Sequence, residues 1–274
     1  YGDADMINFY DERGDFVVPP AKNNIYVGED LSLSAKSVGA NIVIPFSSHH
    51  QYQRSDSVWA QEYITPMHAY TKGLHDDIEF IPAFVRIDCI TGKYEEVKPE
   101  PLTIEIKEPE VFGDNWSDNL DKKDEDILKN YFLKFEHLKK KFGLLSFKVG
   151  NKDFNIKLSN KKEGFQFHAP RNSLIYSIEN GIFDDMLIGN FMKTKLINVA
   201  SLYPDFTPYV TKYGDNGLSK SKHELKKYFD YYKFRSLNYW IDYLQIKTED
   251  IIRPRLENYK KIYFAARWLK RKIN

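Results

Sequence analysis

The sequence predicts an α/β region followed by an α+β region, and three patterns lead to this prediction. An apolar helical face in residues 31–38 is followed by a glycine and an apolar strand at 41–46. Residues 128–142 repeat apolar side chains every three or four positions, which indicates an amphipathic helix. Residues 144–168 hold three short strand-like segments between turn signals. Patterns in this order combine a helix-and-strand layer with a separate strand-rich region.

The first pattern is a helix, a tight turn and a strand. Leu31, Ala35 and Val38 share one helical face, and Gly39 is expected to end the helix in the left-handed conformation. The strand at 41–46 is almost wholly apolar, which is typical of a strand buried on both faces of a layered sheet. Active sites of α/β proteins lie at the ends of such strands. We therefore expect functional side chains just after residue 46.

A connector near residue 115 separates two predicted domains. Three prolines between residues 99 and 109 precede Gly113-Asp114-Asn115, and the segment that follows is strongly charged. We therefore predict a first domain at 1–115 and a second domain at 116–274.

The second domain begins with one predicted amphipathic helix that ends at Gly143. Its apolar positions are Leu128, Tyr131, Phe135, Leu138 and Phe142. Residues 144–149, 152–158 and 164–168 are predicted to form a meander of three strands. Helices are expected further along, one begun by a capping box at Ser221 and Glu224 and one from residue 255 onward.

Composition narrows the function classes. The 274 residues are 42% hydrophobic, enough for a substantial core, and the charges nearly cancel to a formal net charge of +1. No overall field therefore attracts nucleic acid or an anionic membrane. No apolar run reaches the ~20 residues that a transmembrane helix needs. We expect neither a nucleic-acid partner nor a transmembrane segment.

Cys89 is the only cysteine in the chain. A single cysteine excludes an internal disulfide framework and zinc sites built from four cysteines or from two cysteines and two histidines. It favours a reducing, cytoplasmic location. Because Cys89 lies in the apolar run of residues 84–90, we expect a buried, unreactive thiol.

The residues best suited to chemistry are two adjacent histidines after the predicted strand. His49 and His50 follow Ser47-Ser48, so their imidazoles would lie at the edge of the sheet, where a ring nitrogen can bind a divalent metal. The serines and Asp56 could accept a hydrogen bond from the other ring nitrogen. Paired histidines are also common in polar loops, and the residues alone leave both interpretations open.

The block at residues 39–66 carries a resemblance to a known family. It contains VIPFSSHHQYQRSDSVWAQEYITP and resembles the segment of UlaG-like metallo-β-lactamase-fold hydrolases that holds the final metal-ligating histidine. The resemblance implies an αββα sandwich and a divalent metal, zinc first, with manganese or iron as alternatives. It implies that His49 or His50 is a metal ligand and that metal-activated water attacks an ester, amide or phosphoester.

The family's His-x-His-x-Asp-His motif does not occur in this sequence. The chain begins with Tyr1, so we expect it to be a C-terminal portion whose other metal ligands lie upstream. Asp3 and Asp5 resemble the family position that supplies a carboxylate between two metals. The ordinary alternative is a loop that caps the following segment.

Three further residues are candidates for substrate binding. Arg54, four residues after His50, and Arg86 suit an anionic group on a small-molecule substrate. His68 suits a lip of the substrate site. Solvated surface side chains are the ordinary alternative for all three, and the oligomeric state, including a homo-oligomer, stays open.

The region from residue 182 to residue 209 resembles the C-terminal extension of some of these metallo-hydrolases. Together with the predicted meander it faintly resembles a sterol-carrier-like module, which implies an apolar ligand, although its aromatic residues also suit plain core packing. Three alternatives to a hydrolase remain: an oxygenase component linked to a Rieske domain and acting on a sugar nucleotide, a non-catalytic module that binds a lipid or a partner, and a degenerate structural protein. Fingerprints for dinucleotides, nucleoside triphosphates, serine hydrolysis and RNA are lacking.

Overall fold

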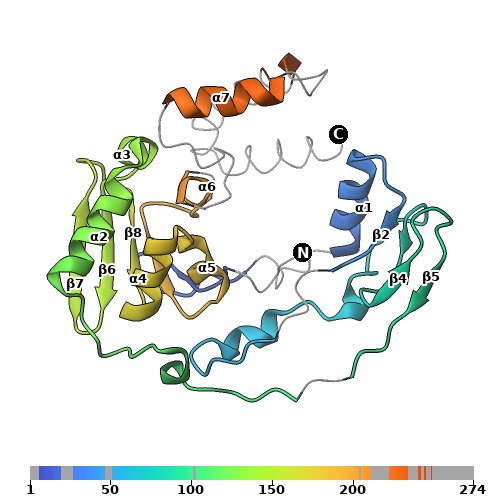
Figure 1. Cartoon of the computed structure of the whole chain (residues 1–274), viewed down its shortest axis with the longest axis horizontal. Helices are drawn as coiled ribbons and strands as arrows, with labels where there is room; N and C mark the ends of the chain where they lie inside the picture. Colours follow the sequence, from blue (N-terminus) through green and yellow to red (C-terminus); the bar gives the residue numbers. More distant parts are fainter. Residues whose placement is uncertain are drawn as a thin grey trace. The chain divides into compact units, whose positions relative to one another are not determined.

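The computed structural model describes residues 6–19, 27–46, 51–100, 103–203, 205–210 and 222–233, with single positions at 240, 241, 244 and 248. It has a mixed α/β fold, which confirms the predicted class at that level (Figure 1). Contacts divide the chain into two compact units. Unit 1 comprises Tyr1–Ile25, Pro45–Met67 and Pro82–Leu218, and unit 2 comprises Tyr26–Ile44, His68–Ile81 and Ser219–Asn274.

Unit 1 is built on a five-stranded mixed sheet with the strand order β1-β9-β8-β6-β7. The strands are β1 (Phe9–Tyr10), β6 (Leu144–Val149), β7 (Lys152–Lys157), β8 (Gly164–His168) and β9 (Lys193–Ile197). The pairs β6–β7 and β8–β9 are antiparallel, whereas β6–β8 and β1–β9 are parallel. Because β1 pairs with β9, unit 1 contains chain from both sides of residue 115. The division into domains at 1–115 and 116–274 stays a prediction.

The predicted meander is wrong in its third strand. β8 pairs in parallel with β6 instead of continuing antiparallel beyond β7. Gly143 accounts for this path, because it donates its N–H to the Glu163 carbonyl and accepts the N–H of Leu158. A Cβ atom at Gly143 would overlap the carbonyl oxygen of Lys161. Because Gly143 has no side chain, the loop after β7 can cross the start of β6. Strand β8 then pairs with the edge of β6 that lies opposite β7.

The helices of unit 1 cover one face of the sheet. They are α2 (Lys122–Leu133), α3 (Glu136–Lys141), α4 (Arg171–Asn180), α5 (Phe183–Ile188) and α6 (Thr207–Val210). Asp121 begins α2 with a reciprocal capping box to Asp124. The single helix predicted for residues 128–142 is wrong, because the chain breaks at 134–135, where Phe135 adopts an extended conformation. After this break Leu138 and Phe142 are both buried in the same core as Leu128.

Aromatic rings dominate the core between these helices and the sheet. Phe147 and Phe167 lie on neighbouring strands and contact Phe183 of α5 at centroid distances of 6.4 and 5.1 Å. Phe132 of α2 meets Phe183 edge-on at 5.3 Å. Edge-to-face aromatic pairs add about 0.5–1.5 kcal/mol each to the effect of burial. Figure 1 shows β6, β7 and β8 side by side, with α4 and α5 next to them.

Unit 2 contains the predicted helix, turn and strand. Helix α1 (Val27–Ser37) is followed by Gly39 with φ +72° and by β2 (Ile42–Val43), which pairs in parallel with β3 (Glu79–Phe80). The expected left-handed glycine is therefore confirmed. Gly28 lies against a loop so closely that a Cβ atom would be 2.6 Å from the backbone nitrogen of Leu74.

Two apolar residues of this segment are not buried as expected. Val38 is 79% exposed because α1 ends at Ser37 and Val38 belongs to the turn, and Phe46 is 87% exposed beyond the end of β2. The strand is thus shorter than the apolar run that predicted it.

The remaining elements are short. They are η2 (Val58–Tyr63), η3 (Met67–Ala69), η4 (Pro109–Phe112), β4 (Val85–Ile87), β5 (Tyr94–Glu96) and α7 (Lys222–Lys233). Cys89 is exposed, so the expected buried thiol is wrong: it lies in the turn of the two-stranded β4–β5 hairpin. Ser221 and the predicted helix from residue 255 lie outside the described residues. Within the described residues, no helix combines the length and the apolar character needed to cross a membrane.

Candidate functional site

The predicted metal ligands lie outside the described part of the chain. Asp3, Asp5, His49 and His50 are all among the residues that the structure does not describe. Within the described ranges, no three His, Cys, Asp or Glu side chains gather in a way that could hold a metal ion. The ligand assignments therefore stay predictions.

Arg54, a predicted substrate-binding residue, sits in a network of acidic partners. Its Nη1 donates to Asp114 Oδ2 at 2.7 Å, and its Nε and Nη2 donate to the two carboxylate oxygens of Asp56 at 3.0 and 2.8 Å. Trp116 Nε1 also donates to Asp56 at 2.9 Å. The Asp114 carboxylate accepts the backbone N–H and the hydroxyl of Ser173 near the start of α4. This network joins the segment after residue 50 to the connector and to α4.

Aromatic rings complete the surroundings of Arg54. The centre of its guanidinium lies 4.1 Å from the Phe191 ring and 5.4 Å from the Phe112 ring. Burial alone would lower the pKa of Arg54, but the hydrogen bonds and charges of Asp56 and Asp114 outweigh burial and raise the pKa. The side chain of Asp114 is fully buried and that of Arg54 is 13% exposed. These contacts describe a structural cation, and a role in substrate binding stays a prediction.

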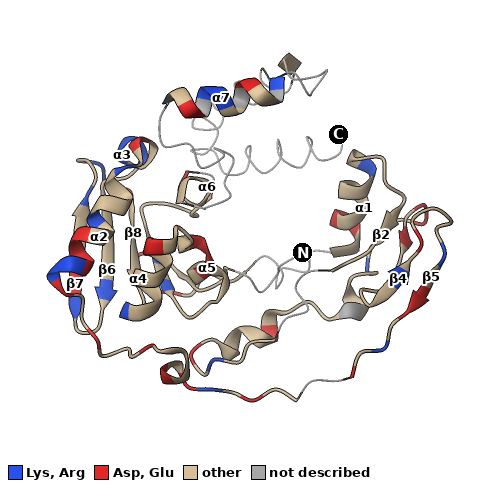
Figure 2. Cartoon of the chain, in the orientation of Figure 1, with Lys and Arg blue, Asp and Glu red and all other residues tan. Residues whose placement is uncertain are grey.

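The other two predicted substrate residues are exposed. Arg86 on β4 pairs with Glu95 on β5 at 2.6 Å, and Figure 2 shows the blue and red segments on the two strands. His68 is exposed in η3. Arg54 and Arg86 thus have separate carboxylate partners, Asp56 and Asp114 for Arg54 and Glu95 for Arg86, and substrate binding by either stays a prediction.

The clearest assembly of polar side chains lies on the second face of the unit 1 sheet, which we call the open face. Strand pairing defines three rows of residues on it. The first row is Asp153, Lys148, His168 and Lys193; the second is Asn155, Ser146, Gln166, Lys195 and Tyr10; the third is Lys157, Leu144, Gly164 and Ile197. Side chains alternate between the faces of a strand, so these rows point away from the aromatic core.

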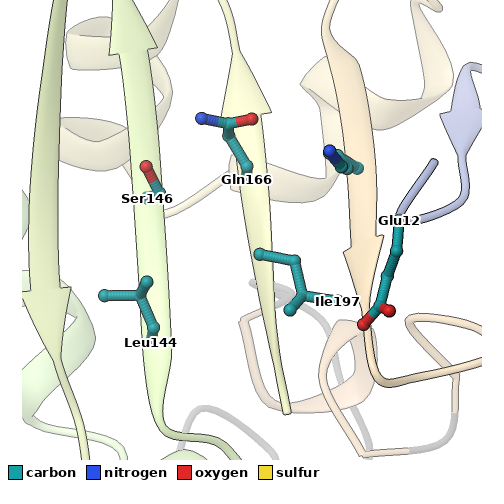
Figure 3. A pocket seen from close by; sticks show the side chains of 6 residues that line it. Glu12, Leu144, Ser146, Gln166 and Ile197 are labelled. Carbon is teal, nitrogen blue, oxygen red and sulfur yellow. The ribbon is translucent and has the colours of Figure 1, made fainter. Parts of the chain in front are cut away.

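A shallow hollow of about 280 Å³ lies on the open face. Figure 3 shows the side chains that line it on β6, β8 and β9 and after β1. They are Glu12, Leu144, Ser146, Gln166, Lys195 and Ile197. Ser146 is buried between longer neighbours. Its short side chain leaves room above the sheet. The hollow therefore combines hydrogen-bonding groups with two aliphatic walls.

His168 lies next to this hollow, between two lysines. In the register of the sheet it stands opposite Lys148 on one side and Lys193 on the other. Its ring meets Trp116 edge-on at 5.0 Å. Burial lowers the pKa of His168, and the charges of Lys148 and Lys193 lower it further, while Asp153 acts in the opposite direction. These effects disfavour protonation of the imidazole.

In the described part of the chain, no carboxylate lies within ion-pair distance of the lysines of the open face. Within the ranges that the structure describes, Lys148, Lys193 and Lys195 form no salt bridge. Among the residues placed by strand pairing or lining the hollow, the acids are Asp153 and Glu12. The Glu12 carboxylate accepts the backbone N–H of Asn198. Chemically, this arrangement can hold an anion.

The sequence interpretation missed this face. The strands were predicted from their apolar positions and turn signals, and His168 was not among the candidate site residues. The signal lies in the alternate positions, where Ser146 and Lys148, then Gln166 and His168, interrupt the aromatic residues. These alternations predict one polar face, but only the pairing of β8 with both β6 and β9 brings them into rows.

A second polar cluster lies at α3 and α6. His137 Nε2 is 3.0 Å from Asp205 Oδ1, and Lys141 is 3.1 Å from the same oxygen. The His137 ring stacks on Tyr209 at a centroid distance of 3.7 Å. The hydrogen bond from His137 is the largest of the effects that lower the pKa of Asp205. These groups satisfy one another, so this cluster serves to hold α3 against the chain that leads into α6.

Comparisons with family models, with curated proteins and with solved structures find no match to this chain.

Proposed function

We propose that this chain is the C-terminal portion of a metal-dependent hydrolase with the metallo-β-lactamase fold. In this proposal residues 1–115 form the C-terminal half of the αββα sandwich, and a metal-activated water attacks an ester, amide or phosphoester. His49 or His50 would bind the metal, zinc first, and the ligands ahead of Tyr1 would complete the site. A small-molecule substrate and a cytoplasmic location belong to the same proposal.

One structural observation supports the proposal: the helix, glycine and strand that precede the histidines. Helix α1 ends at Ser37, Gly39 makes the left-handed turn, and β2 runs parallel to β3. Residues 47–50 follow the carboxyl end of β2 within a few positions. In α/β sheets, ligands bind beyond the carboxyl ends of parallel strands, where loops meet. The resemblance of residues 39–66 to metallo-β-lactamase-fold hydrolases implies that a metal binds at this place.

Metal analysis of the complete polypeptide, including any residues ahead of Tyr1, tests the hydrolase proposal. We expect a stoichiometric transition metal that is lost when both histidines are replaced in His49→Ala/His50→Ala. The matched control is His68→Ala, which removes an exposed histidine of η3 and should leave the metal content unchanged. Full metal retention in the double variant would contradict the ligand assignment.

The open face favours a second candidate, a non-catalytic binding module. The first face of the sheet packs against the aromatic core. The open face instead presents four lysines, a histidine and a hollow, which are groups that can bind a ligand. Ligand retention that is insensitive to metal chelators would support this candidate for unit 1. Both candidates can hold in one protein, because they use different residues.

A further inference from the structure

We propose that the open face of the unit 1 sheet binds the phosphate group of a small molecule, with Lys148 and Lys193 as its principal cationic contacts. His168, Lys195, Ser146 and Gln166 complete the polar surroundings. This site uses none of the predicted metal ligands, so it stands independently of the hydrolase proposal.

Strand geometry sets the spacing of the two principal lysines. Lys148 on β6 and Lys193 on β9 lie in one row, with His168 of β8 between them. Neighbouring strands are about 4.8 Å apart, so the two lysine backbones are about 10 Å apart. Flexible four-carbon side chains can then bring both ammonium groups to opposite sides of one phosphate over the imidazole.

The charge of the face supports an anionic ligand. Lys148, Lys157, Lys193 and Lys195 outnumber the acids Asp153 and Glu12 by two, although the whole chain carries a formal charge of only +1. Like charges on one face repel one another, and only the His168 imidazole lies between Lys148 and Lys193 in the first row. A bound phosphate would relieve this repulsion and form charge-assisted hydrogen bonds, which are stronger than those between neutral groups.

The hollow indicates the size of the ligand and adds hydrogen-bonding and aliphatic contacts to the cationic ones. Its volume of about 280 Å³ is at the lower end for small-molecule pockets, which span about 300–1,000 Å³. The Ser146 hydroxyl and the Gln166 amide can hydrogen-bond to polar groups, and Leu144 and Ile197 offer aliphatic contact. A phosphate with a small organic body fits these walls better than a bare ion.

The position of the acids argues against an extended polyanion. Asp153 lies at the β7 end of the first row, and Glu12 lies beside β9 at the opposite end of the face. A nucleic acid or an anionic membrane laid across the sheet would place phosphates against a carboxylate at each end. A small ligand with its phosphate in the first row would bring only its organic body near Glu12, which lines the hollow. The face therefore suits one compact anion.

Isothermal titration calorimetry with inorganic phosphate and with phenyl phosphate, at constant ionic strength and in chloride buffer, tests the proposal. We expect both ligands to bind the full chain, with phenyl phosphate the tighter of the two. Lys148→Gln/Lys193→Gln should weaken phenyl phosphate binding at least tenfold. The matched control, Lys129→Gln/Lys152→Gln, removes the same charge from exposed lysines outside the open face and should bind as the unchanged chain does.

A second measurement does not depend on any variant. Titration of phenyl phosphate followed by NMR should shift the imidazole resonances of His168 and leave those of His137, which is engaged with Asp205, in place. Equal affinity of the two double variants, absence of binding by the unchanged chain, or binding to phosphatidylserine vesicles without binding to phenyl phosphate would each overturn the proposal.

Discussion

Unit 1 contains two groups of cations that differ in almost every respect. Arg54 is enclosed by two carboxylates and two aromatic rings, and its partner Asp114 is fully buried. Lys148 and Lys193 lie exposed on the open face, on either side of His168, and no carboxylate pairs with them in the described structure.

The difference separates a structural cation from a binding one. A buried guanidinium with satisfied hydrogen bonds holds segments together, and it has little capacity left for a ligand. Exposed ammonium groups that form no ion pair in the described structure, such as those of Lys148 and Lys193 on either side of His168, gain most when an anion arrives. Arg54 was the more obvious candidate in the sequence because it follows His50, yet the lysines have the better geometry.

The largest expected effect follows removal of the buried partner of Arg54. Asp114→Ala would remove the buried acceptor of Arg54 Nη1, leaving Asp56 as the remaining carboxylate partner of that cation, and would remove the acceptor of Ser173 at the start of α4. Breaking a buried ion pair in this way typically destabilises a protein by about 3–5 kcal/mol. Urea unfolding measures the change. Asp118→Ala, an exposed aspartate nearby, should change stability little, and equal stability of the two variants would contradict the structural role.

A smaller effect is expected from Gly143→Ala. The added methyl group would overlap the Lys161 carbonyl, so the loop that carries the chain from β7 to β8 must shift. We expect a loss of about 1–3 kcal/mol, as for overpacked sites, and a weaker phosphate affinity because the row containing His168 moves. Thermal unfolding and calorimetry together measure this. Gly92→Ala makes a useful contrast, since no atom lies within 4 Å of its new methyl group, although its φ of +70° adds strain.

Substitution of the lysines in the first row should increase the free energy of unfolding, whereas the two preceding substitutions decrease it. Lys148→Gln/Lys193→Gln removes two like charges about 10 Å apart on either side of His168, so at low ionic strength we expect the free energy of unfolding to rise by at most about 0.5 kcal/mol. The gain should shrink as salt screens the charges. Denaturant titrations at two salt concentrations measure it. A clear loss of stability would mean that the lysines contribute structurally, as Arg54 does.

The smallest effect concerns the titration of His168. Its pKa should lie below the ordinary value of about 6.5, because of burial and then of Lys148 and Lys193. The unfolded chain then binds more protons than the folded chain, so the stability from this group is present above pH 6.5 and falls as the pH is lowered through that value. NMR titration gives the pKa, and phenyl phosphate should raise it. A pKa above 6.5 in the free protein would contradict the arrangement.

Several elements were predictable because their causes are local. Gly39 ends α1 since only glycine readily adopts a left-handed turn, and β6, β7 and β8 follow alternating apolar residues bounded by turn signals. Helix α2 was predicted from its apolar spacing. The break after it was not, because Phe135 fits the same spacing and the chain departs from the helix only to bury Leu138 and Phe142.

The candidate site was much less predictable. The histidines and aspartates chosen from the sequence lie outside the described residues, and Arg54 proved to be enclosed by Asp56 and Asp114. Asp114 is 60 positions away from Arg54, so no spacing in the sequence could reveal the pair. The sequence shows that residue 54 is a cation, but its carboxylate partners in the folded chain make Arg54 a structural residue.

Local chemistry in the chain therefore determined where helices, strands and turns form, because spacing, capping and glycine conformations act over a few residues. Tertiary contacts decided which strands lie side by side. The path over Gly143 places β8 between β6 and β9, and this pairing alone brings Lys148, His168 and Lys193 into one row. Charges that are 45 residues apart in the sequence repel, or bind a ligand together, only once that sheet has formed.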